Sequence, residues 1–136
     1  MQRITTFDQN LISNLFTQIG ETNLNPNPKY FDNKQNILLV AYDDNELSGF
    51  LYAYLLESLD QLSGKIFLYS VDVFAKFRRQ GIATQLITEL KQLARNNNCS
   101  EIFVLTNQNN QAAMRLYQKT QGVRENNDDV MFVYNL

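Results

Sequence analysis

Residues 71–84 read Val71-Asp72-Val73-Phe74-Ala75-Lys76-Phe77-Arg78-Arg79-Gln80-Gly81-Ile82-Ala83-Thr84, which predicts a strand, a short loop and the start of a helix. The first turn of a helix has unpaired backbone N–H groups and the positive end of the helix dipole. Gly81 and Ala83 have almost no side chain, so a bulky anion can approach these amides, and Arg78 and Arg79 add positive charge beside them. The stretch therefore predicts a pyrophosphate cradle, the alternative being an ordinary helix start with two solvated arginines.

The spacing of this stretch excludes two common phosphate-binding motifs. It does not match G-x-x-x-x-G-K followed by Ser or Thr, so it is not the P-loop of a nucleoside-triphosphate enzyme. It also lacks G-x-G-x-x-G, the fingerprint of dinucleotide-binding folds.

The composition excludes several further classes of function. The chain has 136 residues and no His, which removes His-dependent triads and His-ligated zinc, and we expect no metal. The single Cys99 excludes an internal disulfide, and a net charge of −2 argues against a nucleic-acid partner. The longest apolar run, Phe50–Leu56, is far shorter than the about 20 residues that span a bilayer, and the N-terminus lacks the apolar core of a signal peptide. We therefore expect a cytoplasmic protein without a membrane partner.

Apolar periodicity and turn residues divide the chain into strands and helices. Strands are expected over Gln2–Phe7, Ile37–Tyr42, Glu46–Leu56, Lys65–Phe74, Glu101–Leu105 and Val130–Tyr134. Helices are expected from a cap at Asp8 to Gly20, around Lys29–Asn33 within the loop 21–36, from Ile82 to 96–98, and over Asn110–Thr120. This order predicts an α/β fold, with one domain over 1–136 and a mixed, mostly antiparallel sheet with helices on both faces.

The cradle stretch resembles the acetyl-CoA motif of the GNAT superfamily of N-acetyltransferases. That motif is Gln or Arg, two residues, Gly, one residue, then Gly or Ala, and it stands here as Arg78–Ala83. In the family, the backbone of the preceding strand pairs with the pantetheine arm; the usual proline after this strand is Ala75 here. The resemblance implies a GNAT fold with acetyl-CoA as co-substrate, bound by Val71, Val73, Arg78, Arg79, Gln80, Gly81, Ile82, Ala83 and Thr84.

A second motif, about thirty residues later, is similar to the helix that follows the next strand in GNAT proteins. Asn110, Ala113, Leu116 and Tyr117 stand at the family's spacing. The resemblance implies that Asn110 contacts the pantetheine or phosphate region and that Tyr117 protonates the departing thiolate. A phenol, with a pKa of about 10, can donate a proton to a thiolate of comparable basicity. The alternative for Tyr117 is a core tyrosine on an apolar helix face.

Residues from about 37 to 131 resemble one branch of the superfamily, the aminoglycoside 3-N-acetyltransferases of the gentamicin/fortimicin type. Matching segments include 39–43, 48–54 and 122–125. This resemblance implies a small cationic amine as acceptor and a role in antibiotic resistance. The loop 106–111 contains no acidic residue, whereas this branch is acidic there.

An acceptor amine must lose a proton before it attacks a thioester, so a carboxylate is expected as the general base. Asp72 lies in an apolar strand and shares a face with Ser70, which makes it the first candidate. Glu57, at the end of the preceding strand, is the second. For both, the alternative is a structural or surface carboxylate. The position that carries the base glutamate in the histone-modifying branch is Phe67 here.

Three functions stay open at this stage. The first is direct acetyl transfer to a small cationic amine, without an acyl-enzyme at Cys99. The second is transfer to a protein N-terminus or Lys, and the third is a non-catalytic acyl-CoA-binding module. The apolar strand expected over Val130–Tyr134 could join two copies into a homodimer or belong to the core.

Overall fold

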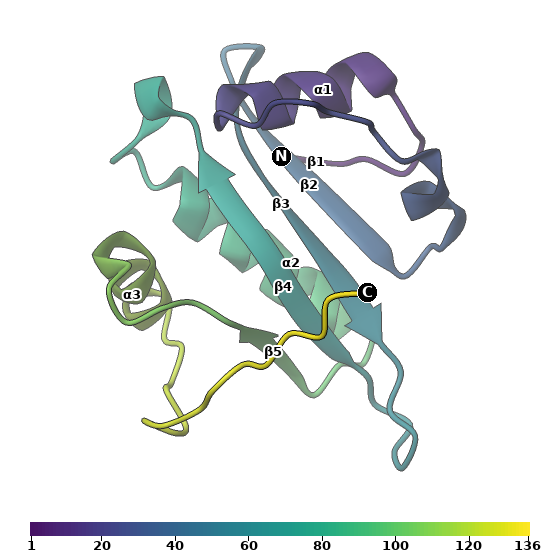
Figure 1. The fold of residues 1–136 in the computed structure, drawn as a ribbon, viewed down its shortest axis with the longest axis vertical. Helices are drawn as coiled ribbons and strands as arrows, with labels where there is room; N and C mark the ends of the chain where they lie inside the picture. The colour runs from purple at the N-terminus through teal and green to yellow at the C-terminus, as the bar shows by residue number, and fades with distance from the viewer. The chain divides into compact units, whose positions relative to one another are not determined.

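The computed structural model describes residues 1–136, which form two compact units, Met1–Leu105 and Thr106–Leu136 (Figure 1). The first unit contains a five-stranded sheet whose strands lie side by side in sequence order. The strands are β1 (Gln2–Arg3), β2 (Asn36–Asp43), β3 (Glu46–Leu56), β4 (Lys65–Val73) and β5 (Glu101–Val104). Only β4 and β5 pair in parallel, which confirms the mixed, mostly antiparallel sheet. The first strand is shorter than Gln2–Phe7, because only Gln2 and Arg3 pair with β2.

The pairing of β4 changes along its length. β5 pairs only with residues 65–68 of β4, so beyond Leu68 this edge of β4 has no strand beside it. On its other edge, β4 pairs with β3 as far as Val73, and the register shifts next to Tyr52 and Ala53. The second half of β4 is therefore an open edge with free backbone groups.

Two helices cover opposite faces of the sheet (Figure 1). Helix α1 (Gln9–Gln18) begins at Asp8, whose carboxylate accepts the N–H of Leu11 at 3.1 Å, as the sequence predicts. Helix α2 (Ile82–Asn96) packs on β2, β3 and β4 through an apolar face whose buried residues are Ile82, Leu86, Ile87, Leu90 and Ala94. Two 3₁₀ helices, η1 (Pro28–Asp32) and η2 (Ala75–Phe77), lie in the connections. None of the helices has both the length and the apolar character needed to cross a membrane.

Alternation along the strands separates the two faces. Phe16 of α1 packs against the rings of Phe50 and Tyr52, with ring centroids 5.3 and 5.9 Å apart, so these β3 side chains point toward α1. Leu51, between them, points toward α2 and is fully buried. Pairing with β3 then places Asp72, the partner of Phe50, on the α1 face of β4.

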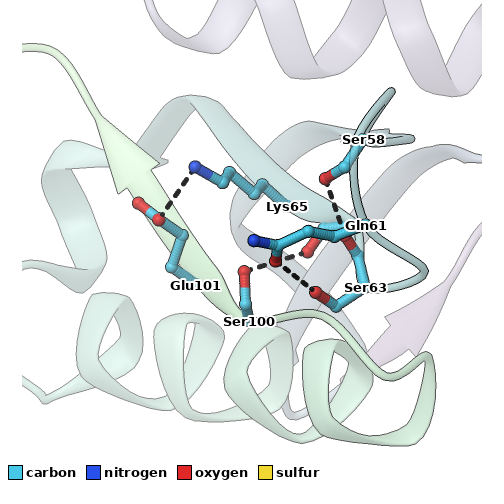
Figure 2. Close-up of polar contacts among 7 residues, drawn as sticks. Ser58, Gln61, Ser63, Lys65, Ser100 and Glu101 are labelled. Carbon is cyan, nitrogen blue, oxygen red and sulfur yellow. Dashed lines mark hydrogen bonds and ion pairs between the residues drawn. The ribbon is translucent and has the colours of Figure 1, made fainter.

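Polar contacts fix the start of β4 and β5 (Figure 2). The ammonium of Lys65 lies 3.1 Å from the carboxylate of Glu101, at the first rung of the parallel pair. The carbonyl of Gly64 accepts the backbone N–H of Ser100 at 2.9 Å and its hydroxyl at 3.4 Å. Within the β3–β4 connection, the Ser58 hydroxyl donates to the carbonyl of Ser63 at 2.6 Å.

The second unit contains one regular element, helix α3 (Gln111–Lys119). The strand expected over Val130–Tyr134 is wrong, because this segment is not paired with any strand and its five side chains are 67–89% exposed. A strand needs a neighbour to satisfy its backbone groups, and an apolar run alone does not provide one. The expectation of a single domain over 1–136 stays a prediction.

Candidate active site at the end of β4

The structure places Asp72 on the open half of β4. Its side chain is half-buried, and the hydroxyl of Ser70 donates to the Oδ2 atom at 2.7 Å, which confirms that the two side chains share one face. An ionised carboxylate has about four acceptor positions, so this one bond leaves it free to accept a further proton or donor. Asp72 therefore has the hydrogen-bonding capacity of a general base.

Gly49 of β3 sets how closely β3 approaches Asp72. A Cβ atom at Gly49 would lie 2.6 Å from the carbonyl oxygen of Asp72 and 3.2 Å from the Cα of Val73. Only glycine permits this contact without moving the strand. This role could not be predicted from the sequence, since an isolated glycine in a strand has several explanations.

The open edge of β4 leads directly into the predicted cradle. Val71 and Val73 are the half-buried residues at this edge, and the buried rings of Phe74 and Phe77 then anchor the turn to the core. Helix α2 follows with Gly81 as its N-cap, at φ +79° and without any side-chain cap. The first-turn amides are thus left available to an external acceptor, as an anion site requires.

Gly81 leaves space in front of these amides. A Cβ atom built at Gly81 would meet nothing within 4 Å, so the approach to the first turn of α2 is open. Arg79 also adopts a left-handed conformation, at φ +64°, which is uncommon for a residue with a side chain. Two left-handed residues in three positions bend the chain sharply before the helix. The geometry fits the pyrophosphate of acetyl-CoA.

The charged residues of the loop differ in what they contact. Arg78 donates from Nε to the carbonyl of Val73 at 3.4 Å, which holds its guanidinium beside the end of β4. Lys76 instead forms an ion pair with Glu46 at 2.9 Å and lies over the ring of Phe77. Arg78 and Arg79, with Gln80, are exposed, so both guanidinium groups are accessible to an anion.

Glu57 lies elsewhere in the first unit. It follows the end of β3, seven residues beyond the partner of Asp72, which is about 20 Å along a strand. Its carboxylate accepts the amide of Gln35 at 2.6 Å. It also lines a cavity of about 630 Å³ together with Arg3, Phe31, Leu55 and Leu93. This cavity contains none of the cradle residues, so the structure does not bring Glu57 to the Asp72 site.

Asn110 and Tyr117 belong to the second unit. Asn110 is the N-cap of α3, and its Oδ1 atom accepts the N–H of Ala113 at 3.1 Å. Tyr117 is half-buried on the same helix, and a Cβ atom at Gly122 would lie 2.9 Å from its carbonyl oxygen. The spacing of Asn110 and Ala113 is therefore explained in part by a helix N-cap, a position that Asn favours.

A strip of aromatic side chains on the sheet was not predicted from the sequence; this aromatic strip consists of Tyr52, Tyr54, Phe67 and Tyr69. Successive members contact one another with ring centroids 5.1–6.5 Å apart. Burial, with the neighbouring Tyr69, Tyr54 and Asp72, raises the pKa of Tyr52 to about 12, and burial also raises the pKa of Tyr54. These hydroxyls therefore stay neutral at physiological pH. Aromatic residues two apart, at 52/54 and 67/69, are the signal that could have revealed the strip.

Comparison with known proteins agrees with this geometry. The model of the acetyltransferase (GNAT) family matches residues 9–123. An aminoglycoside acetyltransferase from an uncultured soil metagenomic sample is 30% identical, with 99% of this chain and 96% of that chain covered and a TM-score of 0.87. Another, from the same kind of source and in complex with sisomicin, is 23% identical, with 99% and 94% covered and a TM-score of 0.89. No curated protein matches the sequence.

A protein-modifying enzyme shares the same fold. The ribosomal-protein-alanine N-acetyltransferase from Brucella melitensis biovar Abortus 2308 is 16% identical, with 98% of this chain and 96% of that chain covered and a TM-score of 0.79. The fold alone therefore does not decide between small-molecule and protein acceptors.

The open fourth strand and the uncapped helix after it agree with the family match, which identifies an acyl-CoA-dependent N-acetyltransferase. The chain belongs to the GNAT acetyltransferase family, whose members use acetyl-CoA as acyl donor. This confirms the fold and the class of enzyme expected from the motifs at 71–84 and 110–117.

Proposed function

We propose that this protein transfers the acetyl group of acetyl-CoA to a primary amine of a small cationic molecule, by direct attack and without an acyl-enzyme. One observation carries the proposal. The half-buried Asp72 carboxylate, held by Ser70 at 2.7 Å, lies on β4, whose edge is unpaired beyond Leu68 and which continues into an uncapped helix. The candidate base, the open strand edge and the anion cradle thus lie within one stretch of 16 residues, 69–84.

The cradle residues bind the acyl donor in this proposal. The backbone of Val71 and Val73 pairs with the pantetheine arm, and residues Arg78, Arg79, Gln80, Gly81, Ile82, Ala83 and Thr84 surround the pyrophosphate. Backbone amides and two guanidinium groups supply charge-assisted hydrogen bonds to it. Asn110 contacts the pantetheine or phosphate region with what its cap to Ala113 leaves available, its Nδ2 amide.

Asp72 and Tyr117 divide the proton transfers. Asp72 removes a proton from the acceptor ammonium, and the freed nitrogen attacks the thioester carbonyl carbon. The new C–N bond forms, the attacking nitrogen loses its second proton to water, and the C–S bond breaks while Tyr117 donates its proton to the leaving thiolate. Asp72 then loses its proton to water and Tyr117 regains one from water, which restores both groups. Glu57 was the second candidate base, but its place at the far end of β3 favours Asp72.

An aminoglycoside is the acceptor class that the family resemblance favours. Two similar folds at 23% and 30% identity are aminoglycoside acetyltransferases, and the 3-amino group is the position to test first. Acetylation would neutralise one cation of such an antibiotic and so confer resistance. The proposal also places the enzyme in the cytoplasm. The proposal further includes a homodimer in which two copies pair through residues 130–134, because this apolar segment is exposed.

Release of free thiol from acetyl-CoA tests the proposal, measured with gentamicin, kanamycin or spermidine and without an amine. Amine-dependent release supports the proposal and identifies the acceptor class. If acetyl-CoA raises the melting temperature but none of these amines releases thiol, the small-cation acceptor is wrong. A panel of peptides with a free N-terminus or Lys then separates a protein acceptor from a binding module. No effect of acetyl-CoA on melting would overturn the cradle itself.

A further inference from the structure

Tyr69 is the most exposed residue of the aromatic strip. Its side chain is 55% exposed, although it lies in the middle of β4, a strand with neighbours on both edges at its start. Three other aromatic rings contact the Tyr69 ring and hold it in position.

A break in register turns Tyr69 outward. Tyr52 pairs with Ser70 and the next residue, Ala53, pairs with Leu68, so Tyr69 is the extra residue of a β-bulge. Its ring stacks on Tyr52, with centroids 5.1 Å apart and planes at 30°. Tyr54 and Phe67 contact it edge-on at 5.9 and 5.7 Å. The bulge therefore presents one supported ring face to a ligand.

The charge around this ring is negative. Asp72 lies on the same face of β4, three residues on, and both Asp72 and Glu21 act electrostatically on the Tyr52 hydroxyl. The cation on the same strand face, Lys65, is engaged by Glu101 at 3.1 Å (Figure 2). The face of an aromatic ring is itself the negative end of a quadrupole. Both features favour a cation over a neutral ligand.

We propose that Tyr69 determines acceptor specificity by binding an organic ammonium ion on its exposed ring face, beside Asp72. This inference rests on the proposed function, because it identifies the ammonium-bearing part of the acceptor as the group that the site selects. The ring attracts the ammonium by a cation–π contact, and the Asp72 carboxylate lies on the side toward which that ammonium must lose a proton. Compact alkylammonium groups are the class that fits best, because they can contact the ring through C–H groups as well as through charge.

Choline and its uncharged isostere 3,3-dimethylbutan-1-ol test this inference without requiring turnover. Each is titrated into the full-length protein by calorimetry at constant ionic strength. Choline should bind about 2- to 30-fold more tightly than the alcohol, which corresponds to a cation–π contact of about 0.5–2 kcal/mol. If the wild-type protein binds the two compounds equally, or does not bind choline, this result by itself overturns the inference.

Four variants locate the residue that causes the preference for choline over the alcohol. Tyr69→Leu should abolish it, and Tyr69→Phe should keep it, because the phenylalanine ring still offers an aromatic face. Tyr42→Leu is the matched control, since Tyr42 is a comparably exposed tyrosine outside the strip, and it should change nothing. A preference that survives Tyr69→Leu but is lost in Asp72→Asn would show that the carboxylate alone selects the cation, and would overturn the role of Tyr69.

The two proposals fail separately. A Tyr69-dependent preference for choline, with no thiol release from acetyl-CoA by any amine, would contradict the proposed reaction and leave the ammonium site supported. Amine-dependent thiol release with the same KM in Tyr69→Leu and wild type would support the reaction and overturn the specificity role.

Discussion

The two ends of the sheet in the first unit each offer a carboxylate, but they differ in everything around it. At the end of β3, Glu57 lines a cavity of about 630 Å³ and accepts a hydrogen bond from Gln35. At the end of β4, Asp72 lies outside that cavity, next to an open strand edge and the uncapped start of α2. The cavity is thus at the Glu57 end, and the unpaired backbone groups are at the Asp72 end.

The contrast between the two ends indicates which feature identifies an acyl-CoA site. A long, flexible thioester is bound along its length by backbone groups and helix amides, so it needs an edge and a cradle more than an enclosed cavity. The Asp72 end provides both, within one continuous stretch of chain. The Glu57 end provides neither, because β3 is paired on both sides there and the adjacent end of α2 is its carbonyl end.

Exchanging the two carboxylates for amides gives the largest expected effect. Asp72→Asn should lower kcat by about 100- to 10,000-fold, the range for losing a general base. Glu57→Gln is the matched control and should leave kcat within twofold, measured as amine-dependent thiol release. A large loss of kcat in Glu57→Gln, with little change of kcat in Asp72→Asn, would instead assign the general base to Glu57.

Removing the Tyr117 hydroxyl tests whether acetyl transfer needs this side chain as proton donor. Tyr117→Phe should slow transfer by about 10- to 1,000-fold while acetyl-CoA binding is retained, because only the proton donor is lost. Steady-state rates and acetyl-CoA titrations separate the two effects. Unchanged rates would assign Tyr117 to packing, the alternative for a tyrosine on an apolar helix face.

Two glycines with the same backbone geometry test the cradle. Gly81 and Gly20 have φ of +79° and +88°, and a Cβ atom at either would meet nothing within 4 Å. Alanine at each should lower the free energy of unfolding by a similar amount, about 1 kcal/mol. Only Gly81→Ala should raise KM for acetyl-CoA, about 3- to 30-fold, as expected for one or two weakened amide hydrogen bonds. The same KM increase in Gly20→Ala would contradict the placement of the cradle.

Alkaline pH probes the aromatic strip beside Asp72. The pKa of Tyr52 is raised to about 12, chiefly by burial, whereas the unfolded chain loses this proton near pH 10. The folded state therefore holds the extra proton above pH 10, and stability falls as the pH rises from about 10 to about 12. Urea unfolding across this range should show the fall. Tyr52→Phe should make it shallower and Tyr42→Phe should not, and an unchanged fall in Tyr52→Phe would contradict the assignment.

The smallest expected effect lies at the Glu57 end. Burial, with the nearby Glu57 carboxylate, raises the pKa of the Cys99 thiol, so little thiolate is present at neutral pH. Cys99→Ala should therefore leave the rate of acetyl transfer almost unchanged. A loss of orders of magnitude would contradict direct transfer and implicate an acyl-enzyme.

The sequence predicted those parts of the molecule whose signals are local. The Asp8 cap, the β2–β3 hairpin with its turn at Asp44 and Asn45, and the start of α2 after Gly81 all depend on neighbouring residues, and all are confirmed. Val130–Tyr134 failed as a strand, because its apolar run says nothing about a pairing partner.

Within the site, the sequence predicted the face that Asp72 shares with Ser70 but not the partners that tertiary packing supplies. The approach of Gly49 to Asp72, and the bulge that exposes Tyr69, depend on the pairing of β3 with β4. Neither the register nor the position of a bulge can be predicted from the sequence of one strand alone. The separation of Glu57 from Asp72, in contrast, was predictable, because consecutive strands of an antiparallel sheet end at opposite edges.

Hydrogen–deuterium exchange with and without acetyl-CoA tests most directly which end of the sheet is the site. Acetyl-CoA should slow exchange at residues 69–84, where the open edge of β4 and the first turn of α2 lie, and leave 33–36 and 55–64 unchanged. Protection concentrated around Gln35 and Glu57, with none at 69–84, would contradict the assignment of the active site to the end of β4.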